Sequence, residues 1–171
     1  AIVMVVIVGS LLAFTASSLK PQINENMRME KQQNILYALG INGNEGKGDV
    51  VFVSTDNVAN EFQTNITEQI VLESKDGKII NQISRQEFID SKEEGKGKEP
   101  YLIDVKKQQA RAKKGKSRFL PLFVGKQKGE TVYVAPIRGK GLWDAIWGFV
   151  TLDKEMVIKG AFFDHAAETP G

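Results

Sequence analysis

The chain begins with a long run of apolar and small residues. The stretch AIVMVVIVGSLLAFTASSL, residues 1–19, contains no charged side chain. As an α-helix it would be about 28 Å long, which matches the roughly 30 Å hydrocarbon core of a bilayer. A buried core helix and a signal peptide are the alternatives, since FTASS offers small residues suited to cleavage. The pattern favours a retained transmembrane helix over residues 1–19.

A second pattern follows directly. QINENMRMEKQQNILYALG is polar at first and then places Ile35, Leu36 and Leu39 on one compact apolar face. The spacing predicts a juxtamembrane helix over residues 20–40 that ends at Gly40 and docks only at its far end. Pro21 removes a backbone donor from this region, which predicts a kink or break near Lys20.

Small residues recur every four positions within the apolar run. Gly9, Ala13 and Ser17 would share one face of a helix. Small side chains let transmembrane helices approach closely, so this face is a candidate for packing against another helix. The spacing alone is a weak signal, because many spans contain such a row.

Residues 41–118 read as an α+β region with polar loops. INGNEGKGD and SKEEGKGKE are glycine-containing loops, and the first lacks the Lys-Ser/Thr ending of a phosphate loop. The apolar runs VVFVS, QIVLESKDGKIINQI and YLIDV are expected to supply a helix and further strands, with a hairpin turn at Asp76-Gly77. The basic stretch 106–118 carries no aromatic residue for base stacking, so a solvated loop or helix face is favoured over an acidic partner or lipid site.

From residue 119 the apolar runs become regular. FLPLFVG, ETVYVAPI, AIWGFVTL and MVIKGAFF are rich in β-branched and aromatic residues and are separated by short polar breaks. Turns are expected at residues 126–129 and 153–155. The pattern predicts a meander of antiparallel strands, and the fold class is therefore α+β.

Composition excludes several kinds of site. The 171 residues include no Cys and a single His, and the formal net charge is +2. Thiolate chemistry, zinc ribbons and iron–sulfur ligation are excluded within this stretch, and a His-based metal site is not expected. A nearly neutral charge balance gives no support for nucleic-acid binding.

Two segments carry candidate binding chemistry. In RGKGLWDAIWG, Gly139 and Gly141 allow close backbone approach, and Trp143 after them is placed to line a pocket. Trp147, four residues on, is interpreted as a core or rim residue. The segment is no dinucleotide fingerprint, since its third glycine is misplaced.

The second segment is HAAETPG, residues 165–171. It presents polar groups where a predicted strand ends. Glu168 and Thr169 offer acceptors and a hydroxyl beside the backbone amides of a Pro-Gly turn, an arrangement that suits the polar edge of a heterocycle. Any polar turn has the same features, so chemistry alone leaves both readings open.

The ordered set of an apolar span, LKP, KQQNIL, GLWDAIWGFV and VIKGAFFDHAAETPG resembles a family of flavin-binding subunits in membrane redox complexes. The family comprises the C subunits of sodium-translocating NADH:quinone oxidoreductases and, as near relatives, the G subunits of Rnf complexes. The resemblance is specific over residues 1–40 and 119–171 and vague between them. It implies that residues 119–171 are the N-terminal part of an FMN-binding domain, truncated at its C-terminal end.

The resemblance implies a covalently bound FMN. In the family the phosphate is esterified to the last threonine of a Ser-Gly-Ala-Thr motif, which lies downstream of ETPG and does not occur in these residues. Thr169 therefore does not inherit the attachment role. Glu168, Thr169 and Gly171 match positions that lie against the flavin ring, and Trp143 and Gly141 are weaker correspondences. His165 stays unassigned.

The resemblance also implies a role and a location. The chain is expected to be an electron-relay subunit of a sodium-pumping NADH:quinone oxidoreductase (a translocase), not catalytic alone, with no catalytic residue and no metal of its own. The alternatives are an Rnf G subunit and a membrane-anchored assembly module without redox activity. Expected partners are the other membrane and peripheral subunits and the lipid bilayer, with no nucleic acid. The expected location is a bacterial inner membrane, single-pass, with a periplasmic domain.

Overall fold

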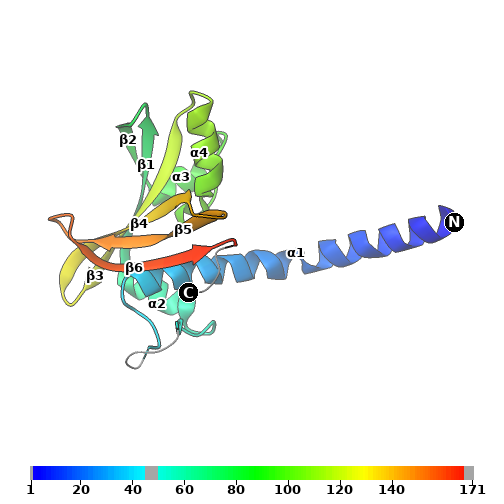
Figure 1. Cartoon of the computed structure of the whole chain (residues 1–171), viewed down its shortest axis with the longest axis horizontal. Helices are drawn as coiled ribbons and strands as arrows, with labels where there is room; N and C mark the ends of the chain where they lie inside the picture. The colour runs from blue at the N-terminus through cyan, green and yellow to red at the C-terminus, as the bar shows by residue number, and fades with distance from the viewer. Residues whose placement is uncertain (1, 45–49, 168–171) are drawn as a thin grey trace.

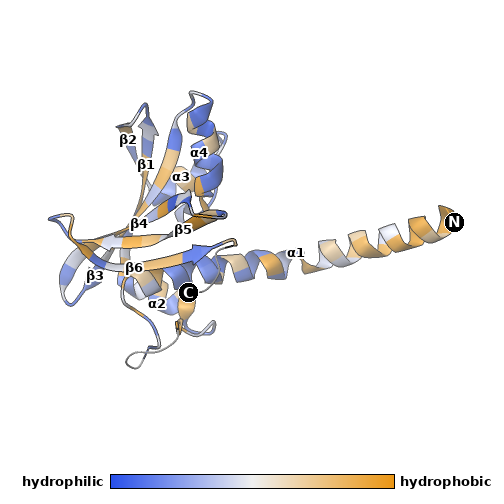
Figure 2. Cartoon of the chain, viewed as in Figure 1, coloured by the Kyte–Doolittle hydropathy of each residue, from blue (hydrophilic) through white to orange (hydrophobic). Residues whose placement is uncertain are grey.

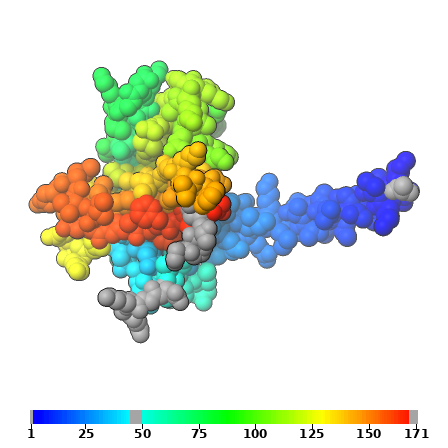
Figure 3. All heavy atoms as spheres, in the orientation of Figure 1, coloured from blue at the N-terminus to red at the C-terminus, as the bar shows by residue number. Residues whose placement is uncertain are grey.

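The computed structural model describes residues 2–44 and 50–167. It consists of a long N-terminal helix and an α+β body built on one antiparallel sheet (Figure 1). The helix, α1 (Ile2–Ala38), extends far out of the body and enters it only at its C-terminal end (Figure 3). The expected fold class is confirmed.

The exposed half of α1 is apolar on all sides. The hydropathy colouring shows apolar residues around its outer half and polar residues nearer the body (Figure 2). Within the described ranges, α1 is the one helix long and apolar enough to cross a membrane, and its most apolar window is entirely exposed. No helix of the body covers this surface, which excludes the interpretation of a buried core helix for residues 2–19.

Of the kink or break expected near Lys20, the structure shows a bend and no break. α1 continues as an α-helix through Pro21, and its axis bends near mid-length (Figure 1). A proline removes one hydrogen bond and crowds the preceding turn, which a bend can relieve without ending the helix. The span and the juxtamembrane helix expected from the sequence therefore form one continuous rod.

The C-terminal end of α1 is capped as its sequence predicts. Gly40 has a φ of +87°, and its N–H donates to the carbonyl of Tyr37, while the N–H of Ile41 donates to the carbonyl of Leu36. This is the Schellman arrangement, in which glycine takes the left-handed position that other residues avoid. The expected docking face is confirmed as well: Ile35, Leu36 and Leu39 are fully or almost fully buried.

Six strands form the sheet in the order β2-β1-β3-β4-β5-β6, and every neighbouring pair is antiparallel. Their bounds are β1 (Ile66–Lys75), β2 (Lys78–Ser84), β3 (Arg118–Gln127), β4 (Glu130–Lys140), β5 (Ala145–Leu152) and β6 (Ile158–His165). The four strands expected after residue 119 are all present as a meander. The hairpin of β1 and β2 from the middle region belongs to the same sheet.

The turns follow the predicted chemistry. Asp76 and Gly77 both have positive φ, 49° and 78°, and Lys128 and Gly129 repeat this pattern with 52° and 86°. Two central residues with positive φ match the right-handed twist of paired strands, so such turns join hairpins tightly. The sequence signals at both places are confirmed.

The connection from β2 to β3 passes over β1 and carries three short helices. They are α3 (Arg85–Asp90), the 3₁₀ helix η1 (Pro100–Leu102) and α4 (Val105–Lys113). A further helix, α2 (Val58–Asn65), precedes β1. Ser84 and Glu87 form a capping box at α3, and the Asp104 side chain accepts the backbone N–H of Lys107 at α4.

Two apolar runs of the middle region do not form strands. Residues 50–54 have no regular secondary structure up to the turn at residue 55, and the run YLIDV is divided between η1 and the start of α4. The local reasons are Pro100, which favours the first turn of a helix, and Asp104, which caps the next one. In the second run, Tyr101 and Ile103 are buried and pack into the core.

Candidate functional site

The larger of two cavities lies between the C-terminal half of α1, the segment from η1 to α4, and the sheet. Its volume is about 680 Å³. The sheet contributes apolar side chains from three strands, Phe123, Pro136 and Phe149 among them, and α1 contributes Met27 and Lys31. Ala166, just after β6, closes one side. The volume falls within the range of pockets that hold cofactors or other small molecules.

The polar side chains of this cavity are mainly cationic. Five are positively charged and two negatively charged: Lys31, Lys98, Lys106, Lys107 and Arg138, against Asp104 and Asp144. A cleft lined by one sign of charge raises the local concentration of ligands with the opposite charge. The lining therefore favours an anionic ligand.

Lys98 is partly buried at the wall of this cavity. Burial lowers the pKa of its ammonium group, and the positive charge of Lys107 lowers it further, while Asp104 acts in the opposite direction. Partial loss of hydration is thus the main cause, and a neighbouring positive charge adds to it. An anion bound in the cavity would stabilise the charged form of Lys98.

Cross-strand pairing sets the position of Arg138. Arg138 on β4 lies opposite Trp147 on β5, and its guanidinium carbon lies 5.7 Å from the centre of the indole ring. The backbone carbonyl of Arg138 accepts a 3.2 Å hydrogen bond from the Gln109 side chain on α4. These two contacts hold a cation and an aromatic face together at the wall of the cavity.

α4 is tied to the sheet by a buried amide. The side-chain oxygen of Gln108, which is 2% exposed, accepts a 2.9 Å hydrogen bond from the backbone N–H of Phe119 on β3. This contact holds the helix on β3, and Lys106 and Lys107 at its start are among the residues that line the cavity. The basic stretch predicted as a solvated face thus has most of its cations in solvent and two at the candidate site.

The structure separates the two tryptophans of GLWDAIWG. Trp147, interpreted as a core or rim residue, lines the cavity, whereas Trp143 sits in the β4–β5 loop with 70% of its surface exposed. Neither Trp143 nor Gly141 is among the lining residues. Glu168, Thr169 and Gly171 lie outside the described residues, so their place relative to the cavity stays a prediction.

Sequence reasoning missed Arg138, Lys98 and Lys107 as site residues. Arg138 and Trp147 are nine positions apart in the chain and become neighbours only through the register of β4 and β5. A signal was available in principle, since a hairpin predicted between these strands brings an arginine close to a tryptophan. Lys98 comes from a loop whose path the sequence does not determine.

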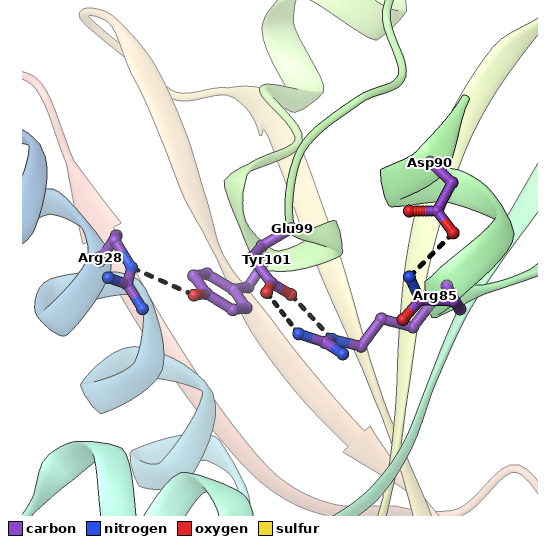
Figure 4. Close-up of polar contacts among 6 residues, drawn as sticks. Arg28, Arg85, Asp90, Glu99 and Tyr101 are labelled. Atoms are coloured by element: carbon purple, nitrogen blue, oxygen red, sulfur yellow. Dashed lines mark hydrogen bonds and ion pairs between the residues drawn. The ribbon is translucent and has the colours of Figure 1, made fainter. Parts of the chain in front are cut away.

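A smaller cavity of about 320 Å³ lies on the other side of Tyr101, between α1, α2 and β1. Tyr101 lines both cavities. Its hydroxyl accepts a 3.2 Å hydrogen bond from Arg28 Nε. The nearby Glu99 carboxylate accepts two hydrogen bonds from the Arg85 guanidinium, from Nε and Nη2 (Figure 4). The first contact joins the polar part of α1 to η1, and the second joins α3 to the residue before η1.

The described residues offer no metal site. Across residues 2–44 and 50–167, no cluster of three or more His, Asp or Glu side chains is placed to hold an ion. The larger cavity instead combines cations, an aromatic face and an apolar floor. These groups fit a planar, anionic cofactor such as a flavin nucleotide, with the cations suited to its phosphate and the apolar floor to its ring.

Comparisons with known proteins agree with the resemblance seen in the sequence. No protein-family model matches the chain. The C subunit of the Na(+)-translocating NADH-quinone reductase of Pseudomonas aeruginosa is 27% identical over 176 residues, which cover all of this chain and 63% of that protein. The chain therefore spans less than two thirds of the length of this relative.

A solved structure has the same fold. The crystal structure of the C subunit of the Na(+)-translocating NADH-quinone reductase from Parabacteroides distasonis matches with a TM-score of 0.60 and 24% identity, over 89% of this chain and 60% of that chain. This likeness shows the shared architecture. The similarity over the whole chain agrees with the resemblance expected from the sequence: the chain is similar to the C subunit of the Na(+)-translocating NADH-quinone reductase.

Proposed function

We propose that this chain is the electron-relay subunit of a sodium-pumping NADH:quinone oxidoreductase, anchored in a bacterial inner membrane by α1. The observation that carries the proposal is the similarity over all 171 residues to a protein named as the C subunit of such a reductase. The exposed apolar half of α1 supports the anchor. In this proposal the complex catalyses the reaction, and the chain supplies one redox site to it.

The proposed cofactor is FMN. When bound, it supplies reversible electron transfer. The family's attachment threonine belongs to a Ser-Gly-Ala-Thr motif that is not part of these residues. The described residues would therefore shape the pocket and leave the covalent bond to another part of the protein.

The residues of the larger cavity would bind and shield the cofactor. Lys98, Lys107 and Arg138 would balance the negative charge of the phosphate, and Phe149 with Trp147 would exclude water from one side. Charge-assisted hydrogen bonds to phosphate are about twice as strong as neutral ones. Glu168 and Thr169 are proposed to complete the site at the flavin ring.

The proposed place of the α+β body is the periplasm. The body would stand on the polar part of α1, which adds about 12–18 Å between the end of the span and the larger cavity, counting from Leu19 to Met27 and Lys31. Labelling of an introduced exposed cysteine, Thr64→Cys, with a membrane-impermeant maleimide in intact cells and in inverted vesicles tests this orientation. Labelling in intact cells is expected, and labelling only in inverted vesicles contradicts it.

Two alternatives remain distinguishable by experiment: the G subunit of an Rnf complex and an assembly module without redox activity. The test is purification from the native host with an affinity tag on this chain, followed by identification of the co-purified subunits and assay of sodium-dependent quinone reduction by NADH. An NADH-oxidising partner and sodium-stimulated activity are expected. A ferredoxin-linked complex, or a complex without flavin in this chain, overturns the proposal.

A further inference from the structure

The register of the sheet divides its residues into two faces. Phe123, Val134 and Phe149 belong to one face, because Phe123 pairs with Val134 and Pro136 pairs with Phe149. This face carries the buried core and is contacted by α1, α2 and the η1–α4 segment. We call it the inner face. Residues that alternate with these point to the opposite, outer face.

The outer face is almost entirely apolar over five strands. Charged and polar residues of this face lie towards the strand ends: Glu68 on β1, opposite Val124, and the pair Lys126 and Thr131 on β3 and β4. The apolar members between them, from β1 to β6, are Ile70, Leu72, Leu120, Leu122, Val124, Tyr133, Ala135, Ile137, Ile146, Val150, Leu152, Ala161 and Phe163.

Solvent reaches this face in the described part of the chain. Phe163 is 56% exposed and Ile137 is 36% exposed, and most of the others are partly exposed, whereas Val134 and Phe123 on the inner face are 0% exposed. The two buried clusters that pack against helices contain inner-face residues of the sheet. No described helix covers the outer face.

A sheet with one face in water normally alternates apolar and polar residues along each strand. β3 and β5 do not alternate: RFLPLFVG and AIWGFVTL place apolar side chains on both faces. Continuous apolar strands are typical of sheets covered on both sides. A contiguous apolar surface of this extent marks a site that another element covers.

We propose that the outer face is covered by a further segment of the same polypeptide, so that the domain has three layers. The length of the relatives outside the matched region supports this occupant. The P. aeruginosa relative matches this chain end to end and still has 37% of its own length outside the match, since the match covers 63% of it. The solved relative likewise has 40% outside, because the match covers 60% of it. The inference concerns the fold and does not depend on the proposed flavin.

The test uses cysteine accessibility in the protein expressed from its complete gene and purified alone. Residues 1–171 contain no Cys, so an introduced thiol can be mapped without interference from this stretch. Leu122→Cys and Val150→Cys place thiols on the outer face of two strands, and Thr64→Cys on α2 is the exposed control. Maleimide labelling at each site is followed by mass spectrometry, with the denatured protein as the reference for complete reaction.

The proposal predicts that both outer-face thiols react about tenfold or more slowly than the control, because labelling must await local opening. Reaction at a rate close to that of the control overturns it. So does protection that appears only in the assembled complex, which assigns the face to another protein of that complex. Protection that depends on protein concentration assigns the face to a second copy and overturns it equally.

A measurement without substitutions guards against misfolded variants. Hydroxyl-radical footprinting of the unmodified protein reports oxidation of Tyr133 and Phe163 on the outer face. Little oxidation of these two rings, beside strong oxidation of the exposed Met156 in the β5–β6 turn, supports the proposal. Oxidation of the two rings to the extent expected from their exposure here contradicts it.

Discussion

The hydroxyl of Thr151 donates a 2.6 Å hydrogen bond to the backbone carbonyl of Ala38, and both residues are completely buried. This contact joins the last turn of α1 to the C-terminal end of β5. The next carbonyl, that of Leu39, accepts a 2.8 Å hydrogen bond from the side chain of Gln127. Carbonyls at a helix end lack partners within the helix, so two side chains of the sheet complete the cap. These two hydrogen bonds join α1 and the sheet into one unit.

Replacing Thr151 with Val tests this junction. Valine keeps the shape but leaves the buried Ala38 carbonyl without this donor, which costs about 1–3 kcal/mol in the free energy of unfolding. Thermal or denaturant unfolding of the protein in detergent measures the change. The control is Thr131→Val on the exposed part of β4, which should change stability little. Equal effects of the two substitutions would show that the buried hydrogen bond contributes nothing specific.

Gly160 on β6 packs directly against the end of α1. A Cβ atom at this position would lie 2.3 Å from the carbonyl oxygen of Ala38, which is backbone and cannot rotate away. Gly160→Ala should therefore separate β6 from α1 and lower the melting temperature. At Gly139 on β4 a Cβ meets nothing within 4 Å, so Gly139→Ala is the matched control. A stable Gly160→Ala protein would mean that the two elements are not in this contact.

Asp153 is expected to make stability depend on pH. Its carboxylate binds the Lys159 ammonium at 2.9 Å and accepts the backbone N–H groups of Glu155 and Val157. The ion pair with Lys159, then these N–H groups, hold the pKa of Asp153 below its ordinary value. A lowered folded-state pKa adds stability above the unfolded-state pKa of about 3.9, and this stability is lost as pH falls through the folded pKa.

The measurement for Asp153 is the difference in melting temperature between the wild type and Asp153→Asn as a function of pH. The difference should be largest and constant between about pH 5 and pH 8 and should shrink below about pH 4. Asp76→Asn, in an exposed turn, is the control for general charge effects. A difference that stays constant down to acid pH would contradict the assigned ion pair.

Much of the fold could be predicted from the sequence because its signals are local. Gly40 ends α1, Asp76-Gly77 makes the first hairpin, and the apolar runs after residue 119 form the meander. Whether Pro21 would bend the helix or end it could not be predicted, since a long helix can accommodate a proline by bending. The run at residues 50–54 does not form a strand: Phe52 and Val53 pack on the core, with Phe52 against the rings of Tyr37 and Phe162, while Val50 and Val51 are exposed.

The candidate site was predicted less completely, for a physical reason. Its lining comes from α1, from the segment between Lys98 and α4, and from the consecutive strands β3, β4 and β5, so that residues far apart in the chain meet there. Trp147 was interpreted as a core or rim residue, and it lines the cavity because the register of β5 places it on the inner face beside Arg138. Short motifs identify the loop tip at Gly141 and Trp143, but only the folded sheet shows which side chains face the cavity.

Glu168 and Thr169 are proposed to contact the flavin ring without attaching it. Glu168→Gln should shift the flavin potential if the carboxylate interacts differently with the oxidised and reduced forms, and a difference of 1.4 kcal/mol corresponds to about 59 mV for a one-electron step. Thr169→Val should lower flavin occupancy. Redox titration and flavin absorbance after denaturation report the two effects, with the exposed Glu155→Gln as control. Unchanged potential and occupancy in both variants would leave these residues as a turn only.

We propose that the complete protein carries a covalent flavin through which electrons pass, with residues of this chain shaping its pocket. The most direct measurement is the absorbance spectrum of the complete protein, purified from its native host and then denatured and separated from free small molecules, together with reduction of that flavin by NADH in the assembled complex. The account predicts one flavin per polypeptide that survives denaturation and is reduced within turnover. A colourless polypeptide from an active complex, or a flavin that NADH does not reduce, would contradict it.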